Sequence, residues 1–292
     1  MPLLFGYPVK VTPTAQNWKL IVSYDGTEFR GWQVQPEQVT VQGELQAALG
    51  RVTGESPLPQ GSGRTDAGVH ALAQVASFAL GAAIPPENLI RALNRTLPDS
   101  IRVLSAAHVP ADFHARHSTV AKTYEYRVFV ERTAAPAQPA PRRICPPFLA
   151  RYVYSYPWPL SLAALNDAAQ RFVGTHDFLS FAATDPDQST RNGGTTVENE
   201  EGEPQKNAIR TVFGSGWHEQ QTADGSLLIY RVRGSGFLHH MVRNLVGTML
   251  DVGRGYTPAD AIPGMIAARA RSAAGPTAPP QGLFLHSVEY PE

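Results

Sequence analysis

The stretch that organises this sequence is Gly61-Ser62-Gly63-Arg64-Thr65-Asp66-Ala67-Gly68-Val69-His70-Ala71. Its three glycines have no Cβ, which lets another backbone approach closely. By spacing alone, the stretch is typical of a tight turn in which Asp66 caps a helix. It lacks the Lys-Ser/Thr ending of a phosphate-binding P-loop, so we set nucleotide binding aside. The arginine and the aspartate among these small residues are the first candidates for a functional site.

Strands and helices are intermixed on both sides of this stretch, and several strands are arranged as hairpins. This pattern predicts an α+β protein with two lobes of mixed, mainly antiparallel sheet and an active-site cleft between them. We expect strands at 18–24, 74–78, 101–109, 120–130, 209–217, 227–232 and 283–290. We expect helices at 41–52, 86–97, 161–173 with Ser161 as N-cap, 237–252 and 258–269.

Composition shifts divide the chain into four parts. Residues 1–17 are punctuated by prolines and are expected to form a loose leader. The connection at 132–150 is rich in proline, which disfavours helices and central strands. The predicted units are therefore an N-terminal lobe at 18–131 and a C-terminal lobe at 151–292, the second with an acidic insert at about 185–206.

The charge balance argues against a generic polybasic nucleic-acid binder, because the 292 residues include 25 basic and 25 acidic side chains. Residues 185–203 contain six of the acidic residues and only Arg191 among the basic ones, so the remaining 24 basic and 19 acidic residues leave the body modestly basic. Cys145 is the single cysteine, which excludes an intramolecular disulfide and a cysteine metal cage. No long apolar segment is present, so we expect a cytoplasmic protein that does not enter membranes.

Further motifs accompany the glycine-rich stretch in a fixed order. They are Tyr24-Asp25-Gly26, Gly31-Trp32-Gln33, Val41-Gln42, Asp112-Phe113-His114-Ala115-Arg116, Lys122-Thr123-Tyr124-Glu125-Tyr126, Gly236-Phe237-Leu238-His239-His240-Met241-Val242-Arg243-Asn244 and Gly282-Leu283-Phe284-Leu285. Together they resemble the tRNA pseudouridine synthase A family over roughly residues 18–290. The resemblance implies an isomerase without a cofactor that converts uridine to pseudouridine at positions 38–40, in the anticodon arm of tRNA. It also implies a homodimer.

The resemblance assigns three central roles. It makes Asp66 the catalytic carboxylate, Tyr124 the ring that stacks on the target base, and Arg243 the cationic partner of Asp66. A free aspartate titrates near 3.9, so the carboxylate is ionised at neutral pH, and a nearby guanidinium keeps it ionised inside a cleft. The family aspartate either attacks the sugar carbon or takes the neighbouring 2′ proton, and the sequence leaves both routes open.

Each of these residues also has a structural interpretation. Tyr124 lies in an alternating strand, where a core aromatic is common. Arg243 lies at the border of the apolar side of its predicted helix, the usual place of a surface arginine. The resemblance indicates that Arg64 and Arg116 contact phosphate, whereas solvated ion pairs would explain them equally well.

We predict no metal site. Two adjacent histidines, His239 and His240, point about 100° apart if they lie on a helix, and no carboxylate or third histidine follows them at ligand spacing. A metal-dependent nuclease would need clustered carboxylates, and the acidic insert has the composition of a solvated loop. A non-catalytic RNA-binding protein remains the alternative, but such a protein has no need of the Asp66 carboxylate opposite a polyanion. We expect the insert to lie away from the RNA, because its charge repels phosphate.

Overall fold

The computed structural model describes residues 15–131, 143–183, 208–222 and 225–291. In these residues one sheet runs through the whole molecule, with the strand order β4-β1-β3-β10-β5-β9-β8-β7; β2 pairs with β3 and β6 pairs with β5. Among the described strands only the pairs β10/β3 and β5/β6 are parallel. A mixed, mostly antiparallel sheet with segregated helices confirms the predicted α+β class.

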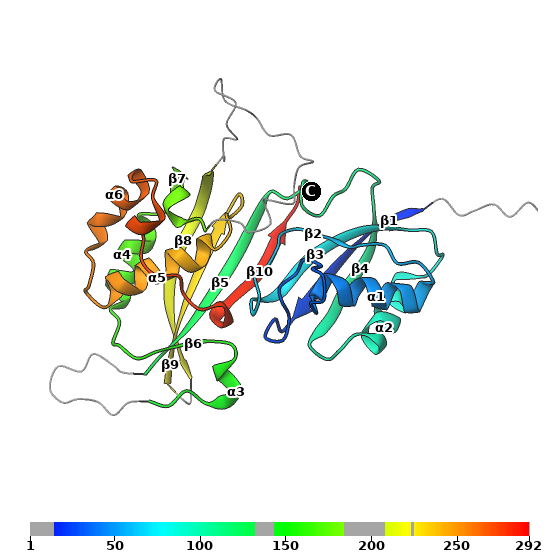
Figure 1. Ribbon diagram of the computed structural model, residues 1–292, viewed down its shortest axis with the longest axis horizontal. Coiled ribbons are helices and arrows are strands. Elements are labelled where there is room, and N and C mark those ends of the chain that lie inside the picture. The colour runs from blue at the N-terminus through cyan, green and yellow to red at the C-terminus, as the bar shows by residue number, and fades with distance from the viewer. Residues whose placement is uncertain (1–14, 132–142, 184–207, 223–224, 292) are drawn as a thin grey trace, which may run out of the picture.

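Figure 1 shows α1 and α2 at one end of the sheet and α4, α5 and α6 at the other, with β10 in red between the two groups. The strands are β1 (Gln16–Tyr24), β2 (Gln60–Gly61), β3 (His70–Leu80), β4 (Ile101–Val109), β5 (Ala121–Val130), β6 (Tyr154–Tyr156), β7 (Gly174–Asp177), β8 (Ile209–Thr222), β9 (Gly225–Gly234) and β10 (Leu283–Glu289). The helices are α1 (Val41–Thr53), α2 (Pro86–Thr96), α3 (Pro147–Ala150), α4 (Leu162–Gln170), α5 (Met241–Gly253) and α6 (Ile262–Ala267).

Local chemistry explains where the main helices begin. The Thr40 side chain accepts a hydrogen bond from the backbone N–H of Gly43 at the start of α1, and Gly54 ends that helix with φ +78°. The Ser161 side chain accepts from the N–H of Ala164 and caps α4, as expected. Proline at the first helical position of α2 supplies a fixed φ where no N–H is needed.

The apolar core covers the inner face of the sheet at both ends. Alternate residues of β1, beginning with Trp18, are fully buried with Leu45 and Leu49 of α1. At the other end α5 is buried on nearly all sides, and the indole nitrogen of Trp217 on β8 lies 3.3 Å from the sulfur of Met249. Both helix groups therefore pack firmly against the sheet, and this packing positions the loops that connect the helices to the strands.

Several expectations need correction. The helix expected from Phe237 begins at Met241, and the segment expected as one helix at 258–269 is a 3₁₀ turn followed by the short α6. The prolines were expected to prevent a helix in 132–147. One helical turn, Pro147–Ala150, begins at the last of these residues, where proline is permitted at the first position. Strands β2, β6 and β7 were not predicted. Most of the leader, residues 132–142 and the acidic insert lie outside the described residues.

Strand β10 joins the two ends of the sheet. It pairs antiparallel with β5 and parallel with β3, where Phe284 lies opposite His70. Strand β5, from the first half of the sequence, lies between β10 and β9 of the second half. Residues far apart in sequence are thereby brought to the same region of the sheet. None of the helices among the described residues has the length and apolarity to cross a membrane.

Candidate active site

Asp66 lies in the loop between β2 and β3, and two glycines of the preceding segment hold this loop. The backbone of Gly31, at φ +89°, packs so closely that an added Cβ would lie 2.6 Å from the carbonyl oxygen of Thr65. The N–H of Trp32 donates to that same oxygen at 3.0 Å. A Cβ on Gly26 would overlap Val69 in the same way. The close backbone approach therefore depends on Gly26 and Gly31, whereas the three glycines of the 61–71 stretch face the side chains of Trp32, Lys122 and Pro280. No helix follows for Asp66 to cap, because residues 70–80 form β3.

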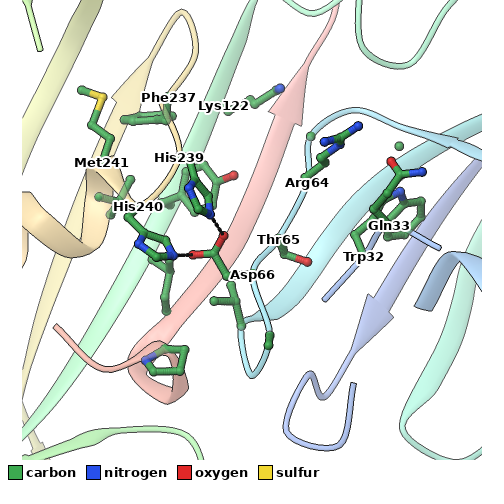
Figure 2. Close-up of a pocket in the computed structure, with 18 of the residues that line it drawn as sticks. Trp32, Gln33, Arg64, Thr65, Asp66, Lys122, Phe237, His239, His240 and Met241 are labelled. Atoms are coloured by element: carbon green, nitrogen blue, oxygen red, sulfur yellow. Dashed lines mark ion pairs between the residues drawn. The ribbon is translucent and has the colours of Figure 1, made fainter. Parts of the chain in front are cut away.

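The loop opens onto a cleft of about 680 Å³, lined by residues from both halves of the chain. One wall comes from Trp32, Gly63, Arg64 and Asp66, and the opposite wall comes from residues 237–243 with Pro280 and Leu283. Tyr124, Lys122 and Arg116 also line it. Figure 2 shows Asp66 facing His239 and His240, with Lys122 and Arg64 farther along the cleft.

Three cationic or potentially cationic groups surround the Asp66 carboxylate. Arg243 Nη1 lies 3.1 Å from Oδ2, while its Nε donates to the carbonyl of Ala278 at 2.7 Å. Nε2 of His239 lies 3.4 Å from Oδ1, and Nε2 of His240 lies 3.3 Å from Oδ2. The Asp66 side chain keeps 20% of its surface exposed, so a substrate can still reach it.

This surrounding favours the ionised carboxylate. Burial alone would raise the pKa of Asp66, but the contacts with His239, His240 and Arg243 outweigh burial and leave its pKa below the usual value. Burial lowers the pKa of His240 despite its proximity to Asp66, which favours the neutral ring at pH 7. At neutral pH the site therefore presents an anionic carboxylate.

The predicted placement of both histidines on a helix, which argued against a metal site, was wrong. His239 and His240 precede α5, and His240 has φ +58°. Their rings lie side by side with centroids 3.9 Å apart. With Asp66 they form a trio of ligand atoms within 4.8 Å of one another, a spacing compatible with one ion. The Arg243 guanidinium is already paired with the same carboxylate, and its positive charge disfavours the binding of a metal ion there.

Tyr124 combines both of its sequence interpretations. Its side chain is only 8% exposed, as in a core residue, yet it lines the cleft beside Gly63. Phe237 meets its ring edge to face, with centroids 5.1 Å apart at 81°. Burial raises the pKa of its hydroxyl far above the usual value, so the phenol stays protonated. An 8% exposed side chain leaves too little of the Tyr124 ring face free for a base to stack on it. Stacking on Tyr124 would therefore require Phe237 or another neighbour to move.

The predicted phosphate contacts lie at the rim. Arg64 and Arg116 are exposed and line the cleft. Lys122 joins them from β5, where its ammonium donates to the carbonyl of Ser62. Burial, and then the charges of Arg116 and Arg210, lower the pKa of Lys122 to about 8. The rim therefore carries positive charge at neutral pH, with Lys122 as its most easily titrated member.

Many cleft residues had no functional role predicted from the sequence, and four of them lie close to the predicted ones: Phe237, His239, His240 and Lys122. All four lie in motifs that the resemblance had matched. Their spacing in the sequence carries no sign that they converge on one cleft, since convergence depends on the pairing of β5 with β9 and on the turn before α5. A motif match without roles was the only available signal.

Comparison with known proteins assigns the class. The sequence pattern of one family, described as tRNA pseudouridine synthase, matches residues 20–118 and 168–291. These segments include Asp66 and Arg243, and they leave out Tyr124 and the proline-rich connection. The chain belongs to this family.

Several similar proteins share one particular name, tRNA pseudouridine synthase A. The protein from Solibacter usitatus is 47% identical over 274 residues, which cover 93% of this chain and 98% of the relative. Those from Bacillus pumilus and Moorella thermoacetica are 42% and 40% identical, again over 93% of this chain and 98% of theirs. The match therefore extends over nearly the full length of each relative.

Proposed function

We propose that the chain isomerises uridine to pseudouridine in tRNA, at positions 38–40 of the anticodon arm, with Asp66 as the catalytic carboxylate. Membership of the tRNA pseudouridine synthase family supports the reaction and the kind of substrate. The observation that carries the assignment of Asp66 is its place in the cleft, ionised and in contact with Arg243 at 3.1 Å. The anticodon positions rest on the resemblance of the motifs.

The reaction breaks the bond between N1 of uracil and ribose and forms a new bond from the sugar to carbon 5 of the base. Carbon 5 loses its proton and N1 gains one, so the product is an isomer of the substrate. A carboxylate beside the sugar can attack its anomeric carbon or remove the neighbouring 2′ proton. Both routes require the anionic form, which the low pKa of Asp66 provides. The basic groups around Asp66 also keep the carboxylate compatible with an incoming polyanion.

The remaining residues of the cleft have positions that suit RNA. Once Phe237 or a neighbour moves aside, Tyr124 offers an aromatic face for a uracil taken out of its stack, a contact that contributes about 1 to 3 kcal/mol in single-stranded nucleic-acid binding. Arg64 and Arg116 are exposed and line the cleft, which supports a role for them in binding backbone phosphates. Their exposure fits contacts that orient the substrate without reading its sequence.

Four expectations complete this proposal. The N-terminal lobe at 18–131 supplies Asp66 and the C-terminal lobe at 151–292 supplies Arg243, so the site needs both. The enzyme acts without a cofactor. It works as a homodimer in the cytoplasm, as the resemblance implies.

The direct test maps pseudouridine in total tRNA incubated with and without the purified protein, with Asp66→Asn in parallel. We expect new pseudouridine confined to the anticodon arm, and none with Asp66→Asn, because the amide keeps the shape and loses the charge. Asp167→Asn on α4, outside the cleft, is the matched control and should behave as wild type. A non-catalytic RNA-binding protein would bind tRNA in gel shift and leave every uridine unchanged. Turnover by Asp66→Asn near the wild-type rate would remove Asp66 from its role.

A further inference from the structure

The turn that precedes α5 has an unusual residue at a strained position. The N–H of Met241 donates to the carbonyl of Leu238 at 3.0 Å, which makes His239 and His240 the two central residues of a tight turn. His240 has φ +58° and ψ +1°. Turns with a positive φ at this position favour glycine or asparagine, because a larger side chain is strained there. The sequence keeps a histidine where turn chemistry prefers another residue.

The side chain of His240 does not serve the helix that it precedes. It is the N-cap residue of α5, yet it makes no capping hydrogen bond. Its Nε2 instead points at Oδ2 of Asp66, at 3.3 Å. Backbone strain at a site is retained where the surrounding structure requires it. His240 therefore combines a left-handed backbone conformation with a ring nitrogen close to the carboxylate.

The two histidines hold different oxygens of Asp66. His239 reaches Oδ1 at 3.4 Å. The two rings contact each other with centroids 3.9 Å apart and planes tilted by 32°, which limits the rotation of either side chain. Arg243 approaches Oδ2 from the first turn of α5. Figure 2 shows both rings facing the carboxylate from the same side. The Asp66 carboxylate is therefore held at both oxygens.

We propose that His239 and His240 are positioning residues for the isomerisation, which fix the orientation of the Asp66 carboxylate through the left-handed turn at His240. This inference rests on the proposed role of Asp66. It assigns the histidines no contact with substrate: they act by restricting the rotation of the carboxylate toward the sugar. Orientation of a reacting group is worth large factors in rate, and a displacement of about 1 Å can cost about 100-fold.

The test separates positioning from folding with three variants of His240 and its neighbour. His240→Asn keeps a residue that tolerates positive φ and removes the ring, so the fold should be unchanged. His240→Gln places an amide nitrogen near the position of Nε2 and should restore much of the contact. His239→Ala removes the second contact without affecting the residue with positive φ. His218→Asn, on an exposed position of β8, is the matched control.

Single-turnover rates at saturating tRNA, tRNA dissociation constants and melting temperatures are measured for each protein. We expect His240→Asn and His239→Ala to lose about 10-fold to 100-fold in maximal rate with unchanged tRNA affinity. We expect His240→Gln to recover most of that loss. Full activity of both His240→Asn and His239→Ala would overturn the proposal, and so would a rate loss that only follows the melting temperature and is not relieved by glutamine. Asp66→Asn is assayed beside them: if it keeps its activity, the proposed function itself is wrong, whereas an inactive Asp66→Asn with fully active histidine variants defeats only the positioning role.

Discussion

Arg243 Nη1 lies 3.1 Å from Asp66 Oδ2, although 177 positions separate the two residues in sequence. The contact joins the loop between β2 and β3 to the first turn of α5. The same guanidinium is fixed from behind by the carbonyl of Ala278. An arginine held in this way can pair with the carboxylate without losing much side-chain freedom on substrate binding.

Loss of this pair should affect catalysis far more than folding. Arg243→Ala leaves a largely buried carboxylate without its fixed positive charge, which raises the pKa of Asp66 and weakens it as nucleophile or base. We expect single-turnover rates to fall by orders of magnitude. The unfolding free energy should fall by about 1 to 2 kcal/mol, between the values of surface and buried pairs. Kinetics and melting curves on one tRNA measure both effects.

Arg243→Lys should recover only part of the rate, because an ammonium cannot keep the contacts with Asp66 and Ala278 in one plane. Arg254, at the end of the same helix, is paired with Asp251 outside the cleft, and Arg254→Ala is the control. An Arg243→Ala protein that stays folded and fully active would exclude the residue from the site. One that unfolds would make it structural.

The sequence predicted most elements because their signals are local. Alternation in β1 and β5, Ser161 before α4 and proline at the start of α2 all act within a few residues of the element they define. The start of α5 was predicted four residues too early, because a positive φ at His240 has no sequence signal when the residue is not glycine. Strands β6 and β7 depend on pairing with β5 and β8, so short segments alone could not reveal them.

The site residues also divide into those that the sequence predicted and those that depend on tertiary structure. Asp66, Tyr124 and Arg243 came from matched motifs, and the structure brings all three to one cleft, while their roles stay predictions. The histidine pair was misinterpreted because the helical geometry assumed for it was wrong. Distances between side chains depend on turns, and turns of this kind are set by tertiary contacts.

Gly31→Ala should displace Asp66 and reduce the rate. The new Cβ would lie 2.6 Å from the carbonyl oxygen of Thr65, and the backbone at φ +89° disfavours any side chain. Gly54→Ala is a matched control, since Gly54 has φ +78° and nothing within 4 Å of an added Cβ. Both variants should lose about 1 to 2 kcal/mol of stability because of the unfavourable backbone conformation. Gly31→Ala should lose more than Gly54→Ala, because its new Cβ also overlaps the carbonyl oxygen of Thr65. Only Gly31→Ala should also lose about 100-fold in single-turnover rate. Equal rates for the two variants would show that the close approach does not position Asp66.

Removal of metal ions should leave the activity unchanged. Asp66, His239 and His240 could hold one ion by their spacing, so this expectation is specific to them. The Arg243 guanidinium already neutralises the carboxylate that would have to bind the ion. The enzyme is dialysed against a chelator and assayed in single turnover, with the tRNA folded beforehand and its fold verified. A loss of activity that zinc or another single metal restores would contradict the expectation of a reaction without metal.

Lys122, whose pKa is lowered to about 8, should make the cleft sensitive to pH. In the unfolded chain a lysine titrates near 10.4. Between these two values the folded protein without RNA loses a proton that the unfolded chain keeps, so stability rises with pH across this window. Below pH 8 Lys122 is charged in the folded protein, and burial of this charge lowers the free energy of unfolding by its full amount. The same charge is then available to a phosphate.

We therefore expect tRNA affinity to fall as pH rises through about 8, because Lys122 then loses the charge with which it meets a phosphate. Lys122→Arg stays charged and should remove this step, whereas Lys122→Gln should bind weakly at every pH and lower the slope of log affinity against log salt by about 1. Dissociation constants are measured from pH 7 to 9 at two salt concentrations, with Lys19→Arg, on β1 and outside the cleft, as control. Because the tRNA titrates equally in all samples, only the difference between proteins counts. A step that persists in both Lys122 variants would belong to another group and would exclude Lys122 from the phosphate contacts.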